Sequence, residues 1–196
     1  MVGASQVWID RNTITDVPVT DDTLPEIVGT AGPILKINLF EYGQPIGSTT
    51  SDAKGDWTFT PTTPLTPGLH NITATAVSAA GVESAPTGVY PITVDTTAPP
   101  LTLDSANDDA GAANGPITPN STTDDSTPTL KGTGEPGAKV TVLDNNVPIG
   151  TTTVKPDGTW ELTPTTPLAD GPHSISATST DPAGNTTAPT APIPFT

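Results

Sequence analysis

Residues 68–76 read Gly-Leu-His-Asn-Ile-Thr-Ala-Thr-Ala, and residues 171–178 read Gly-Pro-His-Ser-Ile-Ser-Ala-Thr. From Ile72 and from Ile175 onward, apolar and hydroxyl side chains alternate in both stretches. A period of two places the apolar side chains on one face of a strand and the hydroxyls on the other. Each stretch therefore predicts a half-buried strand of an antiparallel sheet.

The two stretches belong to a long internal repeat. Shifted by 103 residues, positions 21–93 align with positions 124–196 without a gap and share 32 identities in 73 positions. The block Thr60-Pro61-Thr62-Thr63-Pro64-Leu65, for example, returns as Thr163-Pro164-Thr165-Thr166-Pro167-Leu168. A period of this length indicates consecutive homologous modules. We expect two domains, residues 1–95 and 96–196, with a linker at about residues 95–100.

The composition opposes helix. The chain of 196 residues contains 24 Pro, 18 Gly and 39 Thr, and proline, glycine and β-branched residues are poor helix formers. This argues against a doubly wound α/β enzyme. Turn signals such as Glu135-Pro136-Gly137 and Pro156-Asp157-Gly158 separate short apolar runs. In the second copy, strands are expected at residues 101–104, 129–132, 139–143, 149–153, 160–163, 173–180 and from 192 onward.

These signals predict an all-β protein. About seven short strands in roughly 100 residues, with no helix, are typical of an immunoglobulin-like sandwich. The expected fold is therefore two tandem immunoglobulin-like β-sandwiches of about seven strands each.

Charge and cysteine content narrow the class of protein further. Twenty-one acidic residues against six basic ones give a formal net charge of -15, which repels nucleic acid and anionic membranes. No apolar run approaches the ~20 residues of a membrane span, so no membrane insertion is expected. The absence of cysteine excludes a disulfide framework. Residues 1–6 lack the pattern of a cleavable signal peptide, so we expect either a cytosolic chain or, as the repeat favours, a piece of a longer one.

A set of repeated short motifs resembles a known family. The pattern runs Asp-Asp-x-x-Pro, Gly-Thr-x-x-Pro, Pro-Ile-Gly-x-Thr-Thr, Gly-x-Trp, Pro-Leu-x-x-Gly-x-His, Asp-x-Ala-Gly-Asn and Val-Asp-Thr-Thr-Ala-Pro. Over about residues 7–196 it resembles the bacterial Ig-like repeats of giant secreted adhesins, the biofilm-associated and RTX-type proteins exported by type I secretion. The resemblance implies a tandem array that projects a binding tip from a bacterial surface, with calcium ions that stiffen the domain junctions.

Many of the acidic residues cluster in expected loops, where Ca²⁺ would find the oxygen ligands that it prefers. Strand alternation predicts that Asp16, Asp21 and Asp22 meet Asp95 at one end of the first domain. Asp181 and Asn185 of the second domain are expected to face the same junction. The alternative is that these residues bind no ion: Asp and Asn favour turns for backbone reasons alone, and acidic side chains keep a secreted surface soluble. The candidate calcium ligands are Asp16, Asp21, Asp22 and Asp95, then Asp104, Asp108, Asp109, Asp124 and Asp125, then Asp181 and Asn185.

The repeated aromatic and histidine positions predict structural roles. His70 and His173 are equivalent in the repeat, and a catalytic base would not need to occur in both copies. We expect them to be corner residues that bond the backbone, by analogy with the tyrosine corner. Trp57 and Trp160 are expected to anchor the two cores. No nucleophile–histidine–acid arrangement is implied, so we expect no enzymatic activity.

The primary hypothesis is a structural spacer segment of a bacterial surface adhesin, secreted or cell-surface, that supports cell adhesion or biofilm formation. Its expected partners are the neighbouring Ig-like repeats of the same chain, and any host or surface ligand is expected to bind through other domains. We expect a monomer. Two alternatives stay open: a binding module for glycan, protein or ice, and an accessory module of a secreted hydrolase.

Overall fold

A computed structural model describes residues 7–9, 19–111 and 114–196. The chain divides into two compact units, Met1–Thr96 and Thr97–Thr196, which we describe separately as unit 1 and unit 2. In the described residues all regular structure is strand, as the composition predicts. No helix in this part of the chain is long and apolar enough to cross a membrane.

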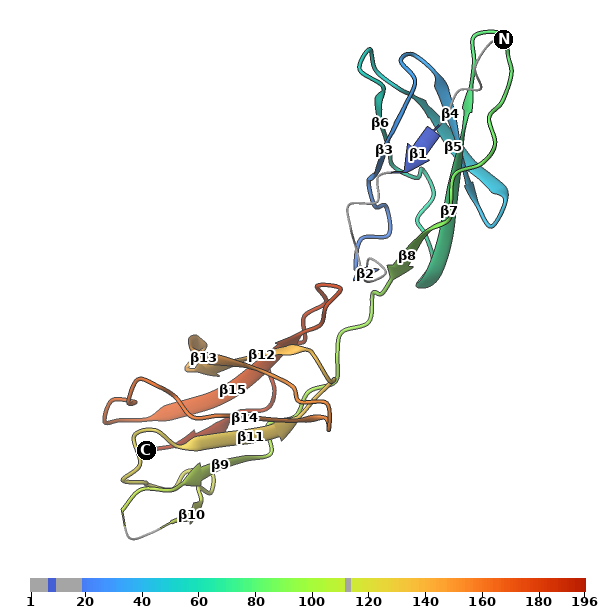
Figure 1. Ribbon diagram of the computed structural model, residues 1–196. Coiled ribbons are helices and arrows are strands. Elements are labelled where there is room, and N and C mark those ends of the chain that lie inside the picture. The colour runs from blue at the N-terminus through green and yellow to red at the C-terminus, as the bar shows by residue number, and fades with distance from the viewer. Residues whose placement is uncertain (1–6, 10–18, 112–113) are drawn as a thin grey trace. The chain divides into compact units, whose positions relative to one another are not determined.

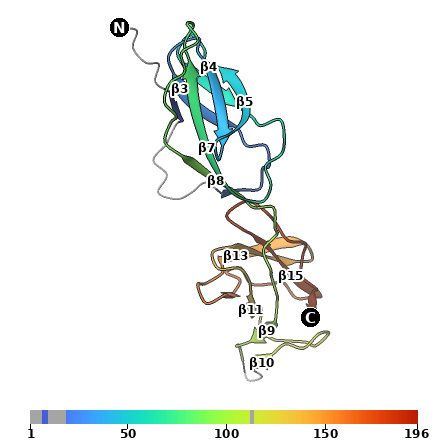
Figure 2. The ribbon, with the colours of Figure 1, turned by 90° about the vertical axis from the view of Figure 1, so that its right-hand side faces the viewer.

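Unit 1 consists of two sheets (Figure 2). The smaller sheet has the order β1-β3-β6, and the larger has the order β2-β8-β7-β4-β5. Neighbouring strands are antiparallel, except that β2 runs parallel to β8. The strands are β1 (Val7–Ile9), β2 (Val19–Thr20), β3 (Ile27–Ala31), β4 (Lys36–Glu41), β5 (Gln44–Thr50), β6 (Asp56–Phe59), β7 (Gly68–Val77) and β8 (Tyr90–Val94).

Unit 2 repeats this architecture (Figure 1). One sheet has the order β10-β9-β11-β14 and the other the order β13-β12-β15-β16. Backbone bonds from Asn120 to Pro194, from Thr196 to Ser121 and from Thr123 to Thr196 hold residues 120–123 alongside the end of β16. The strands are β9 (Ser105–Asp108), β10 (Gly115–Pro116), β11 (Thr129–Thr133), β12 (Lys139–Asp144), β13 (Val147–Thr153), β14 (Thr159–Leu162), β15 (His173–Thr180) and β16 (Ile193–Phe195).

Each unit buries its own core between its two sheets. In unit 1 the inward positions Ile72, Ala74 and Ala76 of β7 are fully buried and belong to one cluster with Trp57. In unit 2, Ile175 and Ala177 of β15 belong to the equivalent cluster with Trp160. Burial of apolar surface at about 25 cal/mol per Å² is the main force that holds such a core together. The predicted sandwiches and tryptophan anchors are confirmed.

One predicted strand is wrong. Residues 101–104 do not form the first strand of unit 2, which is β9 and begins at Ser105. Leu101 makes only an isolated bridge with Gly134, and the register slips by one residue between this bridge and the pairing of Ser105 with Lys131. Leu101 and Leu103 still pack against the core, so the apolar alternation identified inward positions but not a continuous ladder.

The strand count also differs slightly from the expected seven. Among the described residues each unit has eight strands, because the two-residue strands β2 and β10 add to the predicted set. Segments this short carry no periodicity, so the sequence pattern could not indicate them.

In each unit a two-residue turn joins an inner strand to the edge strand of the same sheet. Asn145 and Asn146 connect β12 to β13 with φ values of 49° and 66°, and Tyr42 and Gly43 connect β4 to β5 with 44° and 80°. Positive φ at both central positions defines the type I′ hairpin turn. These turns place Glu41 and Asp144 at the ends of their strands, next to the histidines described below.

Candidate functional sites: carboxylate loops and histidine corners

A group of carboxylates gathers at one end of unit 2. Asp108 is the last residue of β9 and Asp109 follows it, while Asp124 and Asp125 lie on the loop before β11. The Asp109 N–H donates to Asp125 Oδ2 at 3.1 Å. Asp124 lies against Gly111, where a Cβ atom would stand only 2.3 Å from Asp124 Oδ2. The structure therefore brings together four of the predicted ligands from two separate segments.

Loop donors already engage these carboxylates. The Thr123 hydroxyl donates to Asp108 Oδ2 at 2.5 Å and the Ala110 N–H donates to Asp108 Oδ1 at 3.1 Å. The Thr127 N–H donates to Asp125 Oδ1 at 2.8 Å, which is the local turn bond that Asp commonly makes. Asp108 and Asp125 are buried, and buried carboxylates need such partners. These aspartates therefore do stabilise local turns, which is the alternative role that the sequence left open.

Asp104 lies outside this group. Its N–H donates to the Lys131 carbonyl at 2.8 Å, and it precedes β9 whereas Asp108 ends it. Four residues of extended chain separate the two by about 13 Å.

Asp181 and Asn185 form a closed loop after β15. Asp181 Oδ1 accepts the N–H groups of Gly184 at 2.8 Å and Asn185 at 2.9 Å, and Oδ2 accepts Asn185 Nδ2 at 2.9 Å. Burial raises the pKa of Asp181, but the hydrogen bonds from Asn185, Gly184 and Ala183 outweigh that effect and leave the pKa below its ordinary value. The carboxylate therefore stabilises its own loop as an anion.

In unit 1 the predicted ligands lie around the end of β2. The Asp95 N–H donates to the Thr20 carbonyl at 2.9 Å, which places Asp95 near Asp21. The Leu24 N–H donates to Asp22 Oδ1 at 2.8 Å in a local turn. Asp16 lies outside the described residues.

The donor chemistry suits a hard cation, but the geometry of a complete site is missing. Calcium takes six to eight oxygens. Within the part of the chain that the structure describes, no group of three or more His, Cys, Asp or Glu side chains is arranged to hold a metal ion. The carboxylate loops therefore offer oxygens without enclosing an ion, and calcium binding by these residues stays a prediction.

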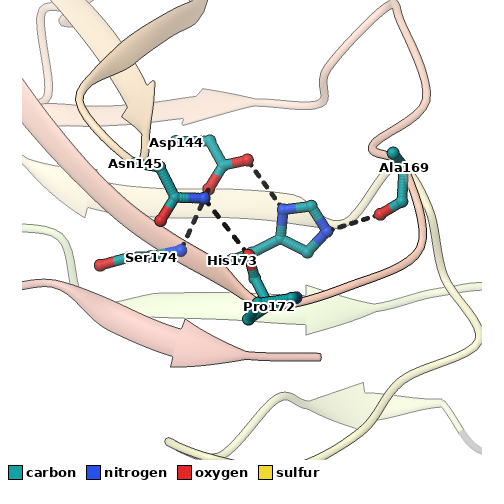
Figure 3. Close-up of polar contacts among 6 residues, drawn as sticks. All are labelled: Asp144, Asn145, Ala169, Pro172, His173 and Ser174. Carbon is teal, nitrogen blue, oxygen red and sulfur yellow. Dashed lines mark hydrogen bonds and ion pairs between the residues drawn. The ribbon is translucent and has the colours of Figure 1, made fainter.

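The histidine of each unit holds a corner of its sandwich. His173 begins β15, and its Nδ1 lies 2.7 Å from Asp144 Oδ2 at the end of β12 (Figure 3). Its Nε2 lies 2.8 Å from the Ala169 carbonyl in the preceding loop (Figure 3). The ring also packs against Phe195 of β16, with 5.4 Å between the ring centroids. One side chain thus connects three elements.

Unit 1 repeats this corner with a different acid. His70 Nδ1 contacts Glu41 Oε1, and Nε2 lies 2.6 Å from the Thr66 carbonyl. The predicted backbone bond is confirmed in both units. The sequence reading missed the carboxylate partner, although a signal exists: an acid stands 29 residues before the histidine in both copies.

The sequence profile of the bacterial Ig-like domain matches residues 12–96 and again residues 97–196. A search of curated proteins finds no match. Among solved structures, the Clostridium thermocellum CbhA fibronectin(III)-like modules match with 19% identity, 97% of this chain and 93% of that chain covered, and a TM-score of 0.51, which shows the fold alone.

Two further structures match at TM-scores too low to carry an argument. A biofilm-associated protein BSP domain matches with 18% identity and a TM-score of 0.36, over 99% of this chain and 29% of that chain. A tetra-tandem repeat from the extending region of a large adhesion protein matches with 21% identity and a TM-score of 0.36, over 97% of this chain and 47% of that chain. This chain therefore spans less than half the length of either.

Proposed function

Because the chain belongs to the bacterial Ig-like domain family, we propose that it is a spacer segment of a bacterial surface adhesin, secreted or displayed at the cell surface, that supports adhesion or biofilm formation. The observation that carries the proposal is the repeat itself. Apart from the two-residue strands β2 and β10, both units keep the same strand order in each sheet, with a tryptophan in the core and a histidine at the corner. The repeat thus duplicates the residues that hold the fold together, and a spacer needs a stable fold.

The tryptophan and histidine side chains, which are common in ligand-binding sites, support the same proposal. Trp57 and Trp160 are 3% and 1% exposed, so neither offers a ring face to a sugar. The two histidines are fixed by backbone and carboxylate partners within their own units. A module that recognises a ligand would need exposed groups of this kind.

A replacement experiment in the parent protein tests the spacer role. Residues 19–196 are exchanged for two unrelated Ig-like domains of similar length, and adhesion of the cells is compared with that of a deletion of the same segment. A spacer predicts that the deletion weakens adhesion and the unrelated pair restores it. If the unrelated pair fails while it is displayed at the normal level, these units carry recognition themselves and the spacer proposal is wrong.

As a second part of the proposal, calcium bound by the loop carboxylates stiffens the array. The expected affinity is in the range of extracellular modules, about 10⁻⁴–10⁻³ M. The test is the thermal midpoint of the chain in millimolar Ca²⁺, compared with NaCl of the same ionic strength, because salt alone also relieves the repulsion within a chain of net charge -15. A specific site predicts a larger increase with Ca²⁺ than with NaCl.

A pair of matched variants refines the calcium test. Asp124→Asn removes an exposed carboxylate from the predicted ligands, and Asp56→Asn removes an exposed carboxylate outside that set. Calcium binding by the clustered carboxylates of unit 2 predicts a smaller increase of the thermal midpoint with Ca²⁺ in the first variant only. Equal effects in both variants, or equal midpoints in Ca²⁺ and NaCl, would contradict it.

A further inference from the structure

Each unit places its histidine between two hydrogen-bond acceptors. In unit 2 the ring nitrogens of His173 face the Asp144 carboxylate at 2.7 Å and the Ala169 carbonyl at 2.8 Å. In unit 1 those of His70 face the Glu41 carboxylate and the Thr66 carbonyl. The chain has two histidines in all, and both are used in this way.

The number of N–H groups decides what this geometry requires. A neutral imidazole carries one N–H and one bare lone pair, whereas an imidazolium carries two N–H groups. Since neither a carboxylate nor a carbonyl can donate, both bonds exist together only when the ring is protonated. Loss of the proton leaves a nitrogen lone pair facing an oxygen lone pair in a largely buried site, where an unsatisfied polar group is costly.

The charged side chains that the structure places around His173 are carboxylates, which favour the cation. Asp144 is itself held in place by the Ser174 N–H at 3.0 Å and by Asn145 Nδ2 at 3.1 Å. The ring lines a small pocket of about 100 Å³ together with Asp170 of its own loop and Asp124 and Asp125 of the loop before β11. Among the described residues that line this pocket there is no lysine or arginine.

We propose that His173 works as an imidazolium ion and forms a pH-operated latch in unit 2, closed in acidic solution and opened as the pH rises. In unit 2 the latch ties the end of β12 to the loop that contains Ala169. When the latch opens, that loop loses its hydrogen bond to the ring, and the wall of the acidic pocket that the loop forms is held less firmly. This inference does not depend on the spacer role.

The pKa of His173 agrees with the geometry. Burial lowers the pKa of this side chain, but the hydrogen bonds to Asp144 and Ala169 and the Asp144 charge outweigh burial, so the pKa is raised above its ordinary value. A raised folded-state pKa contributes stability that is fully present below the unfolded value of about 6.5. That stability is lost as the pH rises through the folded value.

Nuclear magnetic resonance of the unmodified chain tests the latch directly. Two-bond ¹⁵N–¹H correlation spectra report which ring nitrogens carry protons, and with two histidines the spectrum holds two spin systems, assigned with His70→Gln and His173→Gln. The expected result at pH 6 is protons on both nitrogens of His173, with its midpoint above about 6.5. A neutral single tautomer of His173 at pH 6 would overturn the proposal.

Hydrogen exchange then tests what the latch holds. Between pH 6 and pH 9, the Leu168 amide, which donates to the Ser126 carbonyl at 2.7 Å, is expected to lose at least tenfold in protection after correction for the intrinsic rate, while the amides of β12 keep theirs. In Asp144→Asn this loss is expected already at pH 6, whereas Asp170→Asn, which removes a nearby charge without breaking the bonds of His173, behaves as the unmodified chain. If protection of the loop is independent of pH, the latch is wrong.

Discussion

Ile34 adopts a backbone conformation that its side chain opposes. Its φ is 56°, in the left-handed region that β-branched residues avoid. The position that matches it in the repeat is Gly137, with a φ of 89°. Because the Ile34 side chain is 66% exposed, it gains little from burial in return for the strain.

We therefore expect Ile34→Gly to stabilise unit 1. The left-handed conformation costs a non-glycine residue about 1–2 kcal/mol, and the greater freedom of glycine in the unfolded chain returns part of this. The net gain in free energy of unfolding is about 0.5–1 kcal/mol, measurable from the urea midpoint. The reciprocal change Gly137→Ile should destabilise unit 2, and a loss of stability in Ile34→Gly would show that this side chain makes a stabilising contact.

Ser179 is a second position where the repeat suggests an improvement. The side chain is fully buried on β15 and its hydroxyl has no partner among the described residues. The matching residue of unit 1 is Ala76, which is also fully buried. A buried hydroxyl without a partner costs about 1–3 kcal/mol.

Ser179→Ala is thus expected to raise the stability of unit 2 by about 1 kcal/mol, seen as a higher thermal midpoint. The backbone bonds of Ser179 to Thr187 do not involve the hydroxyl and should remain. Ala76→Ser is the matched control and should lower the stability of unit 1. A decrease in Ser179→Ala would mean that the hydroxyl is satisfied after all.

At the scale of strands, the alternation of side chains predicted the inner strands well. The inward residues of β7 and β15 lie where the pattern put them, because only one face of these strands has a core to pack against. The pattern failed at residues 101–104, where the apolar residues point inward but the ladder slips. Side-chain period reports which face is buried and does not report which backbone groups pair.

A glycine on β11 sets the fit between strand and tryptophan. A Cβ atom at Gly132 would stand 2.1 Å from the Thr102 carbonyl oxygen and 2.8 Å from the Trp160 ring. The indole Nε1 donates to that same carbonyl at 3.1 Å. Neither the backbone nor the buried ring can move away easily, since both belong to the packed core.

Gly132→Ala should therefore destabilise unit 2 by about 2–3 kcal/mol through overpacking. Urea denaturation followed by tryptophan fluorescence measures the loss, with Gly137→Ala as a control at an open turn, where no atom lies within 4 Å of the added Cβ but the positive φ remains. A smaller loss in Gly132→Ala than in the control would show that the sheet adapts.

For the whole molecule, two protonation events bound the pH range of greatest stability. The lowered pKa of Asp181 contributes stability above about pH 3.9 that is lost as the pH falls. The raised pKa of His173 contributes stability below about pH 6.5 that is lost as the pH rises. Thermal midpoints from pH 3 to 9 should be highest between these limits.

Single variants separate the two sides of that profile. Asp181→Asn should weaken the pH dependence of the thermal midpoint of unit 2 at acidic pH. His173→Gln should weaken it at alkaline pH. A midpoint that continues to rise from pH 7 to pH 9 in the unmodified chain would contradict the assignment of the alkaline side.

How far the candidate sites could be predicted depended on whether the contacts were local. The acids of unit 2 were identified as a cluster because Asp108 and Asp109 lie close in sequence, as do Asp124 and Asp125. The separation of Asp104 and the pairing of His173 with Asp144 follow from the register of β9 with β11 and of β12 with β15. One sequence gives no direct measure of register between strands far apart in the chain.

The parallel pairing of β2 with β8, and of residues 120–123 with the end of β16, bears on how each unit responds to tension. In both units a segment that follows the first strand runs in the same direction as the last strand. A load that draws the two ends apart slides such segments lengthwise, so the bonds between them resist as a group and fail together instead of peeling one by one. In each sandwich this pairing therefore resists pulling after the first strand, β1 or β9, has taken up the load.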